Sequence, residues 1–144
     1  MRPMIALPVG VAAIAALLAF ASPTYAETVK FKADLKGSSE VPPNQSAGTG
    51  SVTATYDTAT KQFSWKGSYS GLSGPVMAAH FHGPAPVGQN SGVAVAIKPV
   101  TSPFEGSATL TDAQANDLMS GNWYVNIHTD ANKGGEVRGQ LGKM

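Results

Sequence analysis

Hydrophobic and polar residues alternate along most of the chain after about residue 27, in short segments that clusters of Gly, Pro, Asn and Asp separate. From Val29 to Leu35, every second residue is apolar and the residues between them are charged. A repeat of two is typical of a β-strand with one buried face. The same reasoning predicts eight strands, over residues 28–35, 50–56, 62–69, 76–82, 93–97, 104–110, 122–129 and 135–141. We therefore expect an all-β fold, a Greek-key, immunoglobulin-like sandwich or barrel of about eight strands.

The period changes after residue 110. Thr111 followed by Gln114 matches a capping box, in which the two residues satisfy free amide groups at a helix start. Asp112 suits the positive end of a helix dipole, and Gly121 suits a helix end. The sequence thus predicts one short helix over residues 112–120.

The first part of the chain has a different character. Residues 5–21 form an uncharged apolar run, preceded by Arg2 and followed by Ala26. A positive start, an apolar centre and a small residue before the cut are typical of a secretory signal peptide, and the run is short for a membrane span. We expect residues 1–26 to be removed, leaving one domain over 27–144 in a periplasmic or extracellular location. An uncleaved membrane anchor is the alternative.

Composition narrows the range of functions. The chain has no cysteine, which excludes disulfides, thiolate ligands and cysteine nucleophiles. Of ten basic residues one is Arg2, so the mature chain carries nine basic and nine acidic residues and no basic run. This balance argues against nucleic acid as a partner. No basic amphipathic pattern indicates membrane binding once the signal peptide is removed.

The three histidines of the chain are His80, His82 and His128, and alternation places all of them on strand faces turned away from the predicted core. Histidines at i and i+2 on a strand have Cα atoms roughly 6.6 Å apart. Two such imidazoles can converge on one ion at metal–nitrogen distances of about 2.0–2.1 Å. If the two segments are neighbours, His128 is the third ligand. Imidazole suits copper and zinc, so we predict a site for one copper or zinc ion.

Two charged residues of segment 135–141 share the face of the histidines. Glu136 is the candidate for the fourth ligand, and Arg138 is the candidate for an ion pair with Glu40, which lies in a proline-rich loop. Two alternatives stay open. The cluster could be purely structural in a secreted structural or adhesive domain, or a single copper ion could serve a redox enzyme. The sequence shows no clear general base besides Glu136, which weighs against an enzyme.

Four motifs resemble the successive signature blocks of the CHRD domain family, in family order. They are EVPP at 40–43, AHFHGPA at 79–85, YVNIHT at 124–129 and GEVRGQL at 135–141. The resemblance covers residues 28–142 and implies an immunoglobulin-like β-barrel, while the biochemical role of the family is poorly defined. The blocks contain all the residues proposed above for the metal site and the ion pair: His80, His82, His128, Glu136, Arg138 and Glu40.

The His-x-His strand is also similar to a fragment of copper–zinc superoxide dismutase, another Greek-key barrel. The dinuclear site of such a dismutase needs more than the three histidines of this chain. A full dinuclear site is therefore excluded, and a shared fold does not by itself transfer the activity.

Overall fold

The computed structural model describes residues 20–22 and 25–144. The predicted signal peptide, residues 1–26, lies largely outside the described residues. Within the described part, no helix is both long and apolar enough to cross a bilayer.

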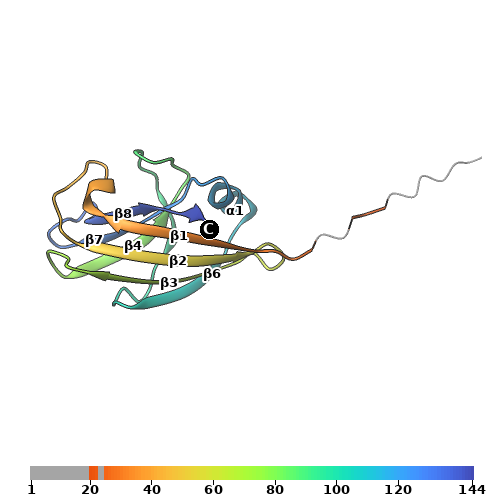
Figure 1. Cartoon of the computed structure of the whole chain (residues 1–144), viewed down its shortest axis with the longest axis horizontal. Coiled ribbons are helices and arrows are strands. Elements are labelled where there is room, and N and C mark those ends of the chain that lie inside the picture. The colour runs from red at the N-terminus through yellow and green to blue at the C-terminus, as the bar shows by residue number, and fades with distance from the viewer. Residues whose placement is uncertain (1–19, 23–24) are drawn as a thin grey trace, which may run out of the picture.

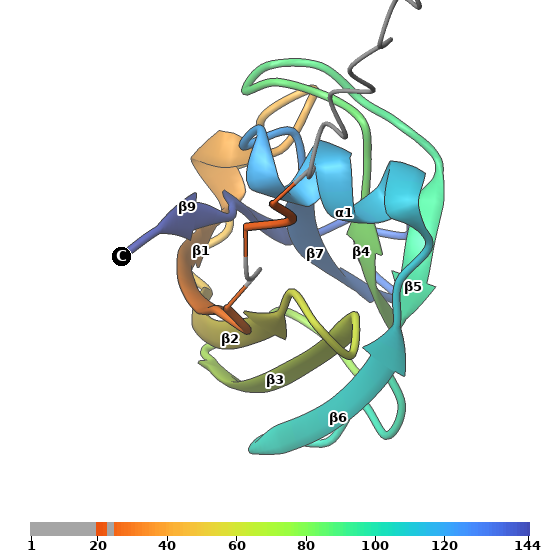
Figure 2. The same ribbon diagram turned by 90° about the vertical axis from the view of Figure 1, so that its right-hand side faces the viewer.

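Eight antiparallel strands form one sheet in the order β5-β4-β7-β8-β1-β2-β3-β6, and a short ninth strand pairs with β1. The sheet curves into a nearly closed barrel with β5 and β6 at the two ends of the path (Figure 2). The all-β barrel prediction is confirmed. The strands are β1 (Thr28–Lys36), β2 (Thr49–Asp57), β3 (Gln62–Ser70), β4 (Val76–His82), β5 (Val93–Ala96), β6 (Phe104–Thr109), β7 (Tyr124–Thr129), β8 (Val137–Gln140) and β9 (Gly142–Lys143).

The predicted helix is α1 (Asp112–Met119), which lies at the end of the barrel near the start of β1 (Figure 1). Its capping box is present: the Gln114 amide nitrogen donates to the Thr111 hydroxyl, and the Thr111 amide nitrogen donates to the Gln114 side chain. Leu118 is fully buried, so the helix packs against the barrel core. A short 3-10 turn, η1 (Gly37–Ser39), follows β1.

Inward-facing residues of the strands fill the barrel. Four aromatic side chains, Phe63, Trp65, Phe81 and Trp123, pack with ring centroids 5.0–6.1 Å apart. Burial of such large apolar side chains supplies most of the favourable free energy of folding. Met77 departs from the predicted alternation, because a register shift at the start of β4 leaves its side chain 64% exposed instead of in the core.

Strands β4, β7 and β8 are neighbours, as the metal-site prediction required. Their outer face is covered by two loops, at residues 41–48 and 83–92. The Asn90 side chain donates to the Val41 carbonyl at 2.9 Å and joins the loops. The predicted polar surface is consequently largely covered: Glu136 and Arg138 are at most 2% exposed, whereas His80 and His128 are half-buried.

Candidate metal centre

The three histidines meet on the outer side of the barrel, where β4 and β7 pair. His80 lies opposite Asn126, and His128 lies opposite Ala78, so His80 and His128 are diagonal neighbours. His82 is one pleat further along β4. The pleat turns all three rings to the same side of the sheet, away from the apolar core.

The ring nitrogens of the three histidines converge. One nitrogen from each ring lies within 4.8 Å of the other two, and His80 Nδ1 is 3.2 Å from His128 Nε2. Two donors on one ion at about 2.0–2.1 Å lie roughly 3.3 Å apart in a tetrahedral site. The spacing of His80 and His128 already matches this value, and His82 needs only a small movement.

Backbone carbonyls hold two of the rings. His128 Nδ1 lies 2.8 Å from the Lys133 carbonyl oxygen, and His82 Nδ1 lies 3.0 Å from the Ser91 carbonyl oxygen. A carbonyl only accepts hydrogen bonds, so the proton is on Nδ1 in both rings and Nε2 is left for the cluster. A carbonyl behind each ring is the usual support of a metal-binding histidine.

The environment favours neutral imidazole, the form that binds metal. Burial holds the pKa of His80 below its ordinary value, and the charges of His128 and His82 lower it further. Burial also lowers the pKa of His82, against the opposing effect of hydrogen bonds from the ring to Ser91 and Asn126.

Glu136, the predicted fourth ligand, is not part of the histidine group. Its side chain accepts hydrogen bonds from the hydroxyls of three residues, Ser46, Ser73 and Thr129, at 2.6–2.8 Å. The Ser73 amide and the Asn132 side chain also donate to it. Burial by itself raises the pKa of Glu136, but these hydrogen bonds hold it at about 2. The carboxylate thus joins three turns of the chain at the end of the sheet.

The predicted ion pair between Glu40 and Arg138 is not formed. The Arg138 guanidinium donates instead to the Asn90 side chain at 2.9 Å and to the Gln89 carbonyl at 2.6 Å. Both acceptors belong to the loop at residues 83–92, which covers this face of the sheet. Glu40 is 6% exposed, and its Oε1 has no hydrogen-bond partner. Burial raises the pKa of Glu40 to about 7, although the charge of Arg138 and the amide of Asn126 oppose the shift.

Tyr124 and Asn126 belong to the site and were not singled out from the sequence. The Tyr124 ring stacks on His82, with centroids 4.7 Å apart and planes 6° apart, and the Arg138 guanidinium carbon lies 3.5 Å from the Tyr124 ring centroid. Strands β4 and β8 flank β7, so the cation and the imidazole approach the ring from opposite sides. Alternation places Tyr124 and Asn126 on the face of His128, and this signal was available in the sequence.

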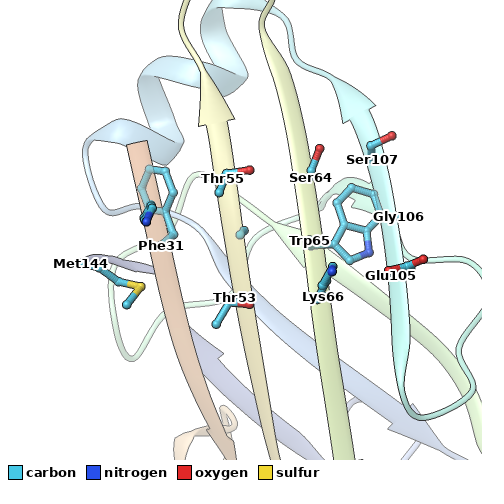
Figure 3. A pocket seen from close by; sticks show the side chains of 12 residues that line it. Phe31, Thr53, Thr55, Ser64, Trp65, Lys66, Glu105, Gly106, Ser107 and Met144 are labelled. Atoms are coloured by element: carbon cyan, nitrogen blue, oxygen red, sulfur yellow. The ribbon is translucent and has the colours of Figure 1, made fainter. Parts of the chain in front are cut away.

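Two grooves differ in their relation to the histidines. One, of about 410 Å³, is lined by His80, Met77 and Lys98 among others, and gives solvent access beside the cluster. The other, of about 620 Å³, lies over β1, β2, β3 and β6 and is lined by Thr53, Lys66 and other residues, none of them histidine (Figure 3). The three histidines therefore lie on the β4–β7–β8 side of the barrel, away from the larger of these two grooves.

A known protein family matches most of the chain. A family model described as the CHRD domain matches residues 31–141. The chain belongs to the CHRD family. The match confirms the resemblance seen in the sequence motifs, and the three histidines of the cluster lie inside the matched region of this CHRD domain. Neither the curated proteins nor the solved structures compared with the chain gave a match.

Proposed function

We propose that this CHRD domain is an exported metal-binding module that holds one copper or zinc ion between His80, His82 and His128. The observation that carries the proposal is the convergence of three ring nitrogens from two strands within 4.8 Å. The support of His82 and His128 by backbone carbonyls and the lowered pKa of His80 and His82 favour the same conclusion. The export is inferred from the apolar segment at the start of the chain.

The donor set favours copper over zinc in affinity. Imidazole nitrogen binds both ions, and the stability order of divalent metals places Cu²⁺ above Zn²⁺ at a site of given donors. Because the chain has no cysteine, no thiolate competes for the ion. We expect both metals to bind and Cu²⁺ to bind more tightly.

The test is titration of the metal-free protein with Cu²⁺ or Zn²⁺ against a competing chelator at pH 7.5. Wild type should bind one ion, and His128→Ala should lose about 100-fold or more in affinity, since one of three donors is removed. An Asn116→Ala variant, changed on the exposed side of α1, should bind like wild type. A wild-type Kd weaker than about 10 μM for both metals would refute the proposal.

Binding should also stabilise the fold and depend on pH. At a free metal concentration of 100 Kd, unfolding should require about 2.7 kcal/mol more, which is on the order of 10 °C in Tm. Affinity should fall as the imidazoles become protonated in acid. For His80 and His82 this begins at a lower pH than for an ordinary histidine, because their pKa values are lowered.

A purely structural cluster is the second candidate, and one observation favours it. His82 is stacked on Tyr124, and both of its ring nitrogens already face oxygen atoms without any metal. In that case His82→Ala would lower the free energy of unfolding, and added metal would not change the Tm of wild type. The metal titration separates the two candidates directly.

A further inference from the structure

Asn126 lies beside the histidines and is buried. It occupies the position between Tyr124 and His128 on the outer side of β7, directly opposite His80 on β4. Its side chain is 4% exposed, and Oδ1 is 2.9 Å from His82 Nε2. The amide oxygen is therefore next to the ring nitrogen that the Ser91 carbonyl leaves for the cluster.

The orientation of this amide follows from its other neighbour. Asn126 Nδ2 and Glu40 Oε1 both crowd the position where a Cβ on Gly135 would lie, so the backbone there leaves a space that the two side chains share. Gly135 has φ +127°, a conformation that only glycine adopts readily. A carboxylate oxygen accepts hydrogen bonds, so the NH₂ group faces Glu40 and the oxygen faces His82.

We propose that the Asn126 side-chain oxygen is the fourth donor of the metal centre, and that Glu40 holds the amide in the orientation that presents it. This inference rests on the proposed function. His80 Nδ1 and His128 Nε2 are 3.2 Å apart, and His82 Nε2 and Asn126 Oδ1 are 2.9 Å apart. With bonds of about 2.0–2.1 Å, these separations correspond to angles of roughly 100° and 90° at a shared ion, between tetrahedral and tetragonal geometry.

The proton balance follows from the tautomers of the rings. In neutral His82 the proton is on Nδ1, where the Ser91 carbonyl accepts it, so the lone pair of Nε2 faces Asn126 Oδ1. A divalent ion accepts both of these lone pairs, and His82 releases no proton. The proton of His80 Nδ1, which His128 Nε2 accepts, moves to His80 Nε2 when Nδ1 binds the ion. Three imidazole nitrogens and one amide oxygen form a neutral donor set.

The experiment compares Asn126→Asp and Asn126→Ala in the full chain, with Asn116→Asp as the matched control at an exposed position of α1. Cu²⁺ affinity is measured at pH 8, where proton competition is weak, and the electron paramagnetic resonance spectrum of each Cu²⁺ complex is recorded. Asn126→Asp should bind about 10- to 100-fold more tightly, because a charged oxygen replaces a neutral one. Asn126→Ala should bind more weakly, and both variants should shift the spectrum. Asn116→Asp should match wild type in both.

Glu40→Gln tests the orienting role. It should lower affinity in the same direction as Asn126→Ala but by a smaller factor, and the double variant should show no additional loss, since both changes act through one amide. Additive losses would overturn the role of Glu40.

If the variants of Asn126 do not fold, wild type loaded with Co²⁺ keeps the proposal testable. The Asn126 side-chain NH₂ resonances should then carry a strong paramagnetic shift that other asparagines lack. Unshifted resonances, or an Asn126→Ala spectrum and affinity equal to wild type, would overturn the fourth donor while the three-histidine site stood. Failure of wild type to bind metal would instead remove the proposed function.

Discussion

The sheet has two halves, β1-β2-β3-β6 and β5-β4-β7-β8. Hydrophobic and polar residues alternate in both, but the outward-facing side chains of the two halves lie in different environments. In β1 and β2, inward residues are buried and the residues between them are largely exposed or half-buried. In β7, five of six residues are buried, and in β8 three of four. The outer face of the first half carries Thr, Ser and Lys in contact with solvent (Figure 3), whereas that of the second carries His, Asn, Glu and Arg beneath two loops.

This difference shows what alternation can and cannot predict. It tells which side chains point away from the core, because successive residues of a strand point to opposite sides. It does not tell whether water or another segment lies on the far side. Where loops cover the outer face, every polar group there needs a partner, since an unpaired buried group is costly. The polar network around the histidines is the result.

The largest effect should come from Glu136→Ala. The change removes a fully buried carboxylate, which leaves the buried Thr129 hydroxyl and the more accessible Ser46 and Ser73 hydroxyls without their acceptor, and should lower the free energy of unfolding by about 3–5 kcal/mol. Glu105→Ala, on the exposed face of β6, should change it by less than about 0.5 kcal/mol. Urea unfolding at pH 7 measures both, and equal values would mean that the two faces do not differ energetically.

Gly135→Ala should have the next largest effect and lower the free energy of unfolding by roughly 3 kcal/mol. A Cβ at φ +127° is strained, and it would also collide with Glu40 and Asn126. The adjacent Gly134→Ala is the control, because nothing lies within 4 Å of its added Cβ, and it should stay within about 0.5 kcal/mol of wild type. Thermal unfolding of the pair is sufficient. A harmless Gly135→Ala would show that the covered face is loosely packed.

Glu40→Gln should alter the pH dependence of stability. Because the pKa of Glu40 is raised to about 7 in the folded protein, the folded state binds the proton more tightly than the unfolded state. This carboxyl therefore lowers stability progressively as pH rises from about 4.5 to 7, by on the order of 2 kcal/mol. The Gln variant should lack this decline.

The effect of Glu136 on the pH dependence of stability has the opposite sign, so this residue is a reference for Glu40. With its pKa lowered to about 2, it stabilises the fold above pH 4.5 and loses this contribution as pH falls towards 2. Urea midpoints at several pH values should separate the two carboxyls. A decline between pH 4.5 and 7 that persisted in Glu40→Gln would assign it to another group.

The smallest predicted difference compares one substitution in the two halves. Thr129→Val removes a buried hydroxyl that donates to Glu136 at 2.8 Å and should destabilise by about 1–2 kcal/mol. Thr53→Val replaces an exposed hydroxyl on β2 with a side chain of similar shape and should change stability by less than about 0.5 kcal/mol. Chemical denaturation of both variants is the measurement, and reversed effects would contradict the contrast between the two halves of the sheet.

Much of the fold could be predicted from the chain alone. The positions of the strands, the capping box at Thr111 and the parity of the three histidines are local properties, each decided within a few residues of sequence. The structure does not match the predictions that Met77 lies in the core, that Glu136 lies with the histidines and that Glu40 pairs with Arg138. Each depends on a register shift or on a loop from elsewhere in the chain.

By itself, the sequence determined that the chain folds as an all-β sandwich or barrel and that its histidines face away from the core, because strand alternation follows from the backbone geometry of each residue. Only the tertiary structure decided that polar residues on the outer face of β7 and β8 are buried, that Arg138 bonds to Asn90 and Gln89, and that Asn126 lies between His82 and Glu40. These contacts join residues more than 40 positions apart. The path of the covering loops sets them, and no local pattern encodes that path.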